Sequence, residues 1–319
     1  MGAFLSFLRG LFDGPVIDEE ASNIHNNTLD TLDTIEESGD CGCENEDCCD
    51  CDNGDCTGGC CDECKNENSI PKIFNQDTKK AALIIGINYV SNNIANDDLN
   101  GCVNDVNNIK STLINHIGFE EENITTLINA EATYENILDG FKKMSEFSKF
   151  QDTELWVSYS GHGGGKFSTE ESDGQNEFIC PADYMTSGII EDKWIRENFI
   201  NQLHLSTKCF VLMDCCNSGS NMNLPFTYTD ENEEDKDNSL CKIIKISGCK
   251  DDQTSADYFD RVDQTYQGAL TNSFSRAVEY DRNMKTLYEN ILKSLKDRQF
   301  TQLPDLSYTD STLICYDLW

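Results

Sequence analysis

The stretches 154-ELWVSYSGHGGG-165 and 209-CFVLMDCCNSGS-220 decide the fold. Each begins with a near-continuous apolar run of strand length and ends in a turn rich in small residues, where glycine permits tight backbone conformations. Apolar runs without alternation are typical of parallel strands that are buried on both faces of a sheet. We therefore interpret both stretches as inner strands whose carboxyl ends carry polar side chains.

The same pattern continues through residues 73–319, where apolar runs alternate with segments of helical spacing. Four more strands are predicted, at 81–90, 124–129, 242–248 and 312–318. The intervening helices are predicted at 102–116, 133–148, 192–203, 268–280 and 285–297. This alternation predicts a mainly parallel six-stranded sheet with helices on both faces, which is an α/β/α sandwich. The active sites of such sheets lie beyond the carboxyl ends of the strands.

Those strand ends hold a histidine and a cysteine. Of the four histidines in the chain, only His162 is framed by glycines at a strand exit. Cys216 follows it by 54 positions, near the spacing of roughly 50 residues found in caspases. An imidazole exchanges a proton near neutral pH, and a thiolate attacks a carbonyl carbon. The pair predicts a thiol-dependent enzyme.

The N-terminal part of the chain differs from the rest in composition. Residues 1–71 contain 18 Asp and Glu against 2 Lys and Arg, in a chain whose formal net charge is −34. Such charge and thin apolar content disfavour a packed core, and they argue against nucleic acid as a partner. We expect 13–72 to be mostly disordered and 73–319 to be the folded domain, with an acidic linker loop at 227–239.

Nine of the 17 cysteines lie between positions 41 and 64. Cys48 with Cys51, and Cys61 with Cys64, have the spacing of zinc knuckles and would supply four thiolates to a zinc ion. The alternative is a flexible segment that is redox-sensitive or lipidated. We find no convincing secretory signal, so we do not expect a disulfide framework.

Residues 1–12 form a short apolar segment. It begins with Met1-Gly2 and has Ser6 four positions later, which is the pattern for myristoylation of Gly2. One acyl chain binds membranes only marginally, and a short apolar helix would supply a second contact. A membrane tether and a helix docked on the folded domain both agree with this segment. No apolar run reaches the ~18 residues of a spanning helix, and we expect a cytoplasmic monomer.

Several short motifs, in order, resemble those of metacaspases, cysteine peptidases of the caspase-like clan. These motifs are YSGHGGG (159–165), DCCNSGS (214–220), NGCVNDV (100–106), CPADY (180–184), SGCKDDQTSAD (247–257), QGALTNSF (267–274) and QLPDLS (302–307). The resemblance covers about 81–319 and implies a caspase-like α/β/α sandwich. It implies that Cys216, rather than Cys215, is the nucleophile and that His162 is the general base and acid. The N–H groups of Gly163 and Cys216 would form the oxyanion hole.

The resemblance also implies an endopeptidase that cleaves after Arg or Lys through a covalent thioester. Asp105 and Asp214 match acidic positions of the family's substrate pocket, and Ser160 and Cys102 match other positions that line it. Two carboxylates in a desolvated pocket favour a guanidinium or ammonium group through charge-assisted hydrogen bonds. We therefore expect the partners to be protein or peptide substrates with Arg or Lys at the cleaved position.

The chain departs from the family at the calcium site. Many metacaspases bind calcium through four Asp, and the matching positions here are Asn176, Asp192, Lys193 and Asn223. One Asp remains, and an ammonium group has entered a site that needs several anionic oxygens. We expect weak calcium dependence or none, and no cofactor that is required for catalysis.

Lys236 is the only basic residue of the acidic loop 227–239 and is the predicted autoprocessing site, with a solvated surface loop as the alternative. Two other functions stay open. A catalytically silent scaffold would use the same fold for binding, although the implied catalytic and pocket residues are all present. A legumain-like peptidase would cut after Asn instead.

Overall fold

The computed structural model describes residues 79–90, 98–150, 152–168, 175–215, 222, 224–228, 240–248, 257–261 and 263–318. Several expectations fall outside these residues. They concern the apolar segment 1–12, the acidic segment 13–72, Cys48, Cys51, Cys61, Cys64, Cys216, Asn223 and Lys236.

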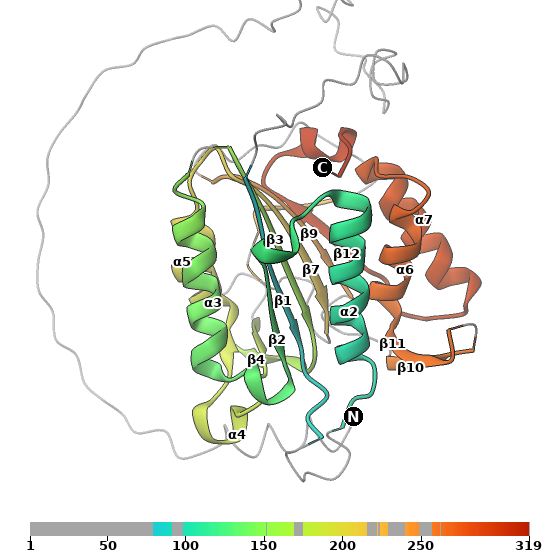
Figure 1. Ribbon diagram of the computed structural model, residues 1–319, viewed down its shortest axis with the longest axis horizontal. Coiled ribbons are helices and arrows are strands. Elements are labelled where there is room, and N and C mark those ends of the chain that lie inside the picture. The colour runs from blue at the N-terminus through green and yellow to red at the C-terminus, as the bar shows by residue number, and fades with distance from the viewer. Residues whose placement is uncertain are drawn as a thin grey trace, which may run out of the picture. The chain divides into compact units, whose positions relative to one another are not determined.

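A seven-stranded sheet forms the centre of the domain, with strand order β2-β1-β3-β7-β9-β12-β8 (Figure 1). The strands are β1 Lys79–Gly86, β2 Ile124–Ile128, β3 Thr153–Ser160, β7 Lys208–Asp214, β8 Phe226–Thr227, β9 Lys242–Ser247 and β12 Asp305–Tyr308. The first five strands in this order pair in parallel, and β12 and β8 add antiparallel pairs. The mainly parallel α/β fold is confirmed, and the predicted number of six strands is corrected to seven.

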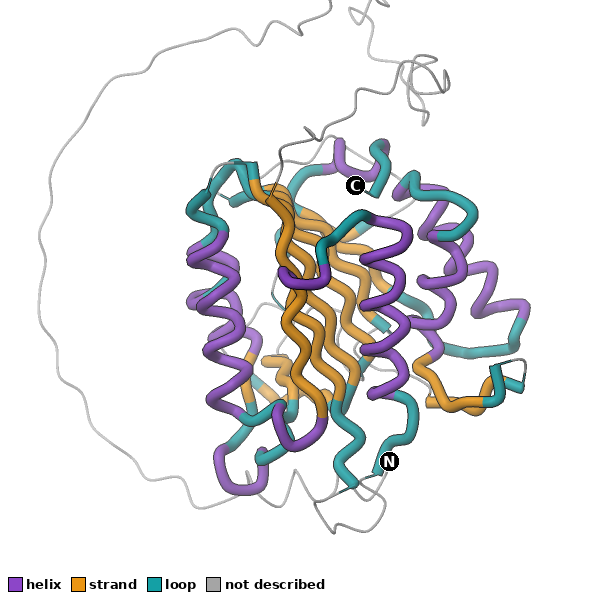
Figure 2. Tube along the Cα trace, viewed as in Figure 1, coloured by secondary structure: helices purple, strands orange, loops and turns teal. Residues whose placement is uncertain are grey.

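Helices cover both faces of this sheet (Figures 1 and 2). On one face lie α2 (Cys102–Thr112), α6 (Ala269–Val278) and α7 (Met284–Asp297), and on the other lie α3 (Tyr134–Phe147) and α5 (Asp192–Asn198). A single π-helical turn, Leu113–Ile117, continues α2, and α4 is a short helix at Tyr184–Ser187. Short 3-10 segments occupy Glu121–Asn123, Asn129–Glu131, Ile200–Gln202 and Ser311–Cys315.

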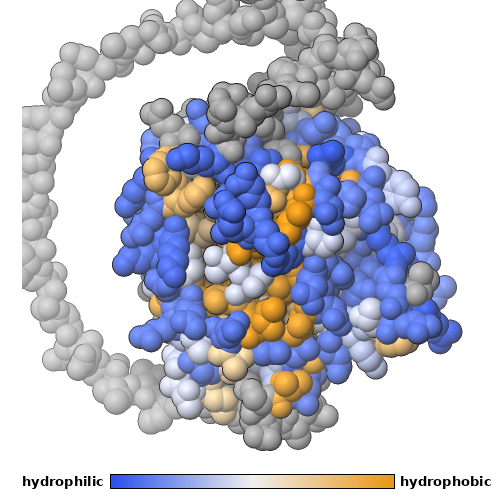
Figure 3. All heavy atoms as spheres, viewed as in Figure 1, coloured by the Kyte–Doolittle hydropathy of each residue, from blue (hydrophilic) through white to orange (hydrophobic). Residues whose placement is uncertain are grey.

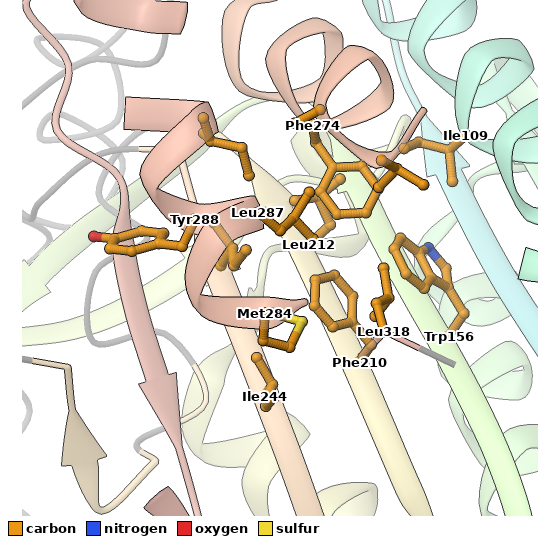
Figure 4. Close-up of a cluster of buried hydrophobic side chains, with 14 of the residues drawn as sticks. Ile109, Trp156, Phe210, Leu212, Ile244, Phe274, Met284, Leu287, Tyr288 and Leu318 are labelled. Atoms are coloured by element: carbon orange, nitrogen blue, oxygen red, sulfur yellow. The ribbon is translucent and has the colours of Figure 1, made fainter. Parts of the chain in front are cut away.

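A hydrophobic core lies between the sheet and the layer of α2, α6 and α7. The rings of Trp156 and Phe210 stack at 4.4 Å, and Phe274 of α6 lies within 5.6 Å of both (Figure 4). Each fully buried side chain of this size contributes about 1.5–3 kcal/mol. Hydrophilic side chains dominate the face of the molecule in Figure 3, and hydrophobic ones are seen mainly between the helices. This packing holds the layer of α2, α6 and α7 against the parallel strands.

The predicted strand over 312–318 is wrong. Ser311–Cys315 forms a 3-10 helix, and the carboxylate of Asp310 accepts a hydrogen bond from the N–H of Thr312 at its start. Leu313 and Ile314 are still buried in the core. A short apolar run does not distinguish a strand from a buried helical turn. Here the apolar side chains are buried from a 3-10 helix instead of a strand.

Two small sheets were not predicted. One contains β4 (Gly163–Phe167), β5 (Gln175–Ile179) and β6 (Ile190–Glu191), and the other is the hairpin of β10 (Asp257–Asp260) and β11 (Thr265–Gly268). The first sheet begins at Gly163, directly after His162, and the second ends at Gly268. Among the residues that the structure describes, no helix combines the length and apolar character needed to cross a membrane.

Candidate active site

The carboxyl ends of three neighbouring strands place Gly86, Ser160 and Asp214 in one row. Gly86 of β1 pairs with Ser160 of β3, which pairs with Asp214 of β7. Residues paired across strands direct their side chains to the same face of a sheet. His162 follows Ser160 by two positions, and Cys216 follows Asp214 by two. The register thus gives both predicted catalytic residues the same offset from a paired row.

The carboxylate of Asp105 reaches this row from the first turn of α2. The hydroxyl of Ser160 donates to Asp105 Oδ2 over 2.6 Å. The backbone N–H of Gly268 donates to both oxygens of Asp105, at 2.9 and 3.1 Å. Asp105 and Ser160 are 2% and 5% exposed. A buried carboxylate needs several such donors, and Ser160 and Gly268 supply them to Asp105.

Asp214 is held in the same way, by the N-terminus of α6. The N–H of Thr271 donates to Asp214 Oδ2 over 2.8 Å. The residue at the N-cap position of α6 is Gly268, which has no side chain to cap the helix. The two aspartates therefore take the place of a cap. Negative charge at a helix N-terminus is stabilised by about 0.3–1 kcal/mol, and by up to ~2 kcal/mol when partly buried.

Gly268 has to be glycine because of space. Its φ of −71° and ψ of 137° are open to any residue. A Cβ at this position would lie 2.2 Å from Asp214 Oδ2 and 2.7 Å from Asp105 Oδ2. Both carboxylates therefore lie directly against Gly268, so the two predicted pocket residues are close to each other. Sequence reasoning missed Gly268 and Thr271, although both lie in the motif at 267–274.

Cys102 lies at the same corner, where α2 begins. It is 4% exposed. A Cβ on Gly86 would lie 2.4 Å from the carbonyl oxygen of Cys102 and 2.4 Å from a methyl group of Val106. Gly86 therefore lets the first turn of α2 lie directly on the end of β1. This close approach brings Asp105, one turn further along α2, to Ser160.

His162 is held through its backbone. Its N–H donates to the hydroxyl of Tyr89 over 3.0 Å, and its carbonyl oxygen accepts from the hydroxyl of Tyr159 over 2.7 Å. The ring of Tyr89 lies against the imidazole, with centroids 4.4 Å apart and planes inclined by 31°. His162 is 6% exposed. Neither tyrosine was predicted from the sequence.

Gly163 begins β4 directly after this histidine and pairs with Ile179 of β5. It is buried. The oxyanion role of its N–H stays a prediction, as does the role of Cys216, which lies outside the described residues. Cys215, the last described residue before it, is 1% exposed.

Asn176 and Asp192, two of the predicted calcium positions, lie beside β6. The side-chain N–H of Asn176 donates to Glu191 Oε2 over 2.7 Å, and Lys166 Nζ is 2.5 Å from Glu191 Oε1. Burial works against it, but hydrogen bonds from Lys166 and Asn176 lower the pKa of the Glu191 carboxyl. Asp192 Oδ1 accepts from the N–H of Lys193 over 2.7 Å.

The described residues at this place do not fit a calcium ion. The ammonium group of Lys166 is already paired with the nearby carboxylate of Glu191, and Asn176 carries no charge. In the part of the chain that the structure describes, no three His, Cys, Asp or Glu side chains lie close enough together to hold a metal ion. Asn223 lies outside that part.

Residues 79–225 match the family described as metacaspase, peptidase C14 domain. The chain is similar to Metacaspase-1A of Neurospora crassa, at 28% identity over 291 residues that cover 72% of this chain and 62% of that protein. It is also similar to Metacaspase-2 of Arabidopsis thaliana, at 30% identity over 239 residues that cover 68% of this chain and 56% of that protein. The aligned region thus spans only about three-fifths of these relatives' length.

Among solved structures, the chain is similar to protein GSU0716 from Geobacter sulfurreducens. The two share a TM-score of 0.54 and 22% sequence identity, over 74% of this chain and 96% of that one. At this identity the likeness concerns the fold alone.

Proposed function

We propose that this chain, which is similar to metacaspases over most of its described part, is a caspase-like cysteine peptidase of that family and hydrolyses peptide bonds after Arg or Lys. The observation that carries this proposal is the pair of buried carboxylates, Asp105 and Asp214, which meet at Gly268 on the edge of the sheet that also holds His162. Two buried carboxyl groups at the same strand ends as His162 would favour a cationic side chain at the bond that is cut.

In the proposed reaction, the imidazole of His162 takes the proton of the Cys216 thiol. The sulfur then attacks the carbonyl carbon of the substrate and forms a tetrahedral intermediate. His162 returns the proton to the leaving amine as the C–N bond breaks, which leaves a thioester. A water molecule, deprotonated by the same imidazole, hydrolyses the thioester and restores the thiol. The N–H groups of Gly163 and Cys216 would stabilise the negative oxygen.

The pocket residues support a preference for positive substrates. A guanidinium group donates several hydrogen bonds in a fixed plane and matches carboxylate oxygens well. An Asp side chain would meet two negative charges, and an Asn side chain would leave them uncompensated. Ser160 and Gly268 hold Asp105 by hydrogen bonds, so a substrate would find that carboxylate already oriented. This argues against Asn-directed or Asp-directed cleavage.

Fluorogenic peptides that differ only in Arg, Lys, Asn or Asp at the cleaved position test the proposal. We expect the Arg and Lys peptides to be cut at least roughly 100-fold faster than the others, because charge-assisted bonds contribute about 1.5–3 kcal/mol each. Cys216→Ala and His162→Ala should each abolish cleavage, and Cys215→Ala is the matched control that should retain it. Cleavage after Asn would support a legumain-like enzyme, and no cleavage of any peptide would support a silent scaffold.

We also propose that catalysis needs no calcium. The ammonium of Lys166 is already paired with Glu191 beside Asn176 and Asp192, and would repel a divalent cation. The initial rate of peptide cleavage, measured in millimolar calcium and in excess chelator, should be the same within about twofold. A sharp rise in calcium contradicts this proposal and leaves the peptidase assignment intact.

The remaining proposals concern residues outside the described part of the chain. We propose autoprocessing at Lys236, which mass spectrometry of the active enzyme against Cys216→Ala would detect as a cut linker. Myristoylation of Gly2 and zinc binding by the C-x-x-C pairs are tested by intact mass and by metal analysis of the full chain. We further propose a cytoplasmic monomer that acts on proteins or peptides, with no nucleic-acid partner.

A further inference from the structure

The backbone of His162 is fixed at both its N–H and its carbonyl by two buried tyrosine hydroxyls. Tyr89 accepts from the N–H, and Tyr159 donates to the carbonyl oxygen. Tyr89 in turn donates to the carbonyl oxygen of Cys180 over 2.6 Å, and the two hydroxyl oxygens are 3.0 Å apart. The N–H of Cys180 also donates to the carbonyl of His162 over 3.1 Å. These hydrogen bonds connect the two hydroxyls with the backbone N–H and carbonyl groups of His162 and Cys180.

Gly161 makes room for this network. A Cβ at that position would lie 2.7 Å from the hydroxyl oxygen of Tyr159 and 2.9 Å from that of Tyr89. Glycine immediately before the histidine therefore serves the approach of both hydroxyls. Gly161, the first of the four glycines in the motif at 159–165, is thus required by the close approach of two tyrosines from different strand ends.

Tyr89 adopts a backbone conformation that is rare for a large side chain. Its φ is +58°, in the left-handed region, while its side chain is 2% exposed. Such a conformation costs about 1–3 kcal/mol unless the surroundings impose it. Asn88 helps to impose it, because its N–H donates to the side chain of Asn129 over 2.8 Å and its own side chain accepts from the N–H of Val103. The strained backbone places the ring and the hydroxyl of Tyr89 against His162.

The hydroxyls cannot be the groups that exchange protons in the reaction. Burial is the main cause that raises the pKa of Tyr89 and of Tyr159 well above the usual value of 10. Both therefore stay protonated across the pH range in which an imidazole titrates. Their protons serve to hold the carbonyls of Cys180 and His162, so their part is geometric.

We propose that Tyr89 is a positioning residue for the imidazole of His162, which it orients by stacking against the ring and by holding the N–H of the same residue. For its effect on rate this inference rests on the proposed peptidase function. A reacting group that is displaced by about 1 Å loses roughly 100-fold in rate. Tyr159 completes the restraint from the carbonyl side.

An NMR experiment tests the geometry without any activity. Imidazole carbon-bound protons of the full-length protein are recorded, and the signal that disappears in His162→Gln identifies this ring among four histidines. Because an aromatic ring 4.4 Å away shields such protons, we expect the signal to lie upfield in the native protein. It should stay upfield in Tyr89→Phe and move downfield in Tyr89→Leu. An unchanged signal in Tyr89→Leu overturns the stacking.

Kinetics test the consequence for catalysis. Tyr89→Phe keeps the ring but loses the hydroxyl, and should lower kcat roughly 10-fold at unchanged KM, as one hydrogen bond to a positioned group predicts. Tyr89→Leu should lower kcat roughly 100-fold. Tyr288→Phe is the matched control, because its buried hydroxyl also donates to a carbonyl, that of Pro304, within the other helical layer. Its kcat should stay within about twofold of the native value.

Each outcome points to one conclusion. A native kcat in both Tyr89 variants, with folded NMR spectra, overturns the inference, as does an equal loss in Tyr288→Phe, which would mark a general effect on stability. If Tyr89→Leu does not fold, Tyr89→Phe decides the matter. A native protein that cuts no peptide while its imidazole signal still lies upfield contradicts the proposed function and leaves the positioning intact.

Discussion

At the carboxyl edge of the sheet, buried charge is held by backbone N–H groups, whereas at the amino edge charged side chains compensate one another. Asp105 and Asp214 bind the N–H groups of Gly268 and Thr271 at the start of α6. At the opposite edge, Lys80, Glu154, Lys208 and Lys242 are in register across β1, β3, β7 and β9.

The amino-edge row has the features of a structural ion cluster. Lys80 Nζ is 3.0 Å from Glu154 Oε2, and it also donates to the carbonyl of Ile117 over 2.9 Å. Glu154 is fully buried, and this burial raises the pKa of its carboxyl despite the nearby lysines. Burial likewise lowers the pKa of Lys208 to about 8. Burial thus disfavours the charged forms of both Glu154 and Lys208.

This difference between the two edges supports the proposed preference for a cationic substrate at the carboxyl edge. Backbone dipoles stabilise a carboxylate without adding a mobile positive charge, so carboxylates held in this way would still attract the guanidinium of the proposed substrate. A lysine beside a carboxylate removes that attraction. The same register therefore places the proposed substrate pocket at one edge and an ion cluster at the other, and substitutions at the two edges should have separable effects.

Gly268→Ala should have the largest effect, at the carboxyl edge. Its Cβ would overlap the oxygens of Asp214 and Asp105, so both carboxylates have to move. We expect kcat/KM for Arg peptides to fall by roughly 100-fold or more, as measured with fluorogenic substrates. The control is Gly118→Ala, near the start of β2, where φ is +80° but no atom lies within 4 Å. It should cost about 1–2 kcal/mol of stability and leave kcat/KM within about twofold.

Asp105→Asn should have the next largest effect. It keeps the size of the side chain and removes its charge, so we expect kcat/KM for Arg and Lys peptides to fall roughly 10–100-fold. The matched change at the amino edge is Glu154→Gln, which should lower the free energy of unfolding by about 1–3 kcal/mol with kcat/KM unchanged. Steady-state kinetics and urea unfolding measure the two. A loss of activity in Glu154→Gln equal to that in Asp105→Asn would break the comparison.

Lys208→Met should alter how stability depends on pH. The pKa of Lys208 is about 8 in the folded protein and 10.5 ordinarily, so the unfolded chain binds more protons between these values. Stability contributed by this group therefore rises with pH from about 8 to about 10.5. The charges around it are Glu154, Lys242, Asp152 and Lys80. Urea midpoints across this range should rise less steeply in the variant, and a slope equal to that of the native protein would refute the assignment.

Lys293→Met should have the smallest effect. Lys293 Nζ and Asp297 Oδ2 are 2.6 Å apart on α7, but both side chains are more than half exposed. Exposed pairs at this spacing contribute about 0.3–0.5 kcal/mol. We expect the free energy of unfolding to change by no more than that in thermal or urea melts, with no change in kcat/KM. A change above about 1 kcal/mol would mean that exposed and buried lysines of this domain differ less than we infer.

The inner strands were predictable because sequence and burial agree there. β1, β3, β7 and β9 are buried on both faces, so their apolar runs are nearly continuous. The small strand β4 was missed because three of its five residues are glycine, which has low strand propensity. The error at 312–318 arose because burial, which the sequence does record, is shared by strands and helical turns.

The sequence by itself determined the parallel sheet, the resemblance to metacaspases, and the predicted places of His162 and Asp105, since hydrophobic pattern and short motifs are local properties of the chain. Only the tertiary structure decided that Gly268 lies on two carboxylates and that Tyr89 lies against the imidazole. The first contact joins residues 163 positions apart and the second joins residues 73 apart. Neither has a periodicity or a spacing along the chain, because contacts of this kind are set by which strand ends the sheet register brings together.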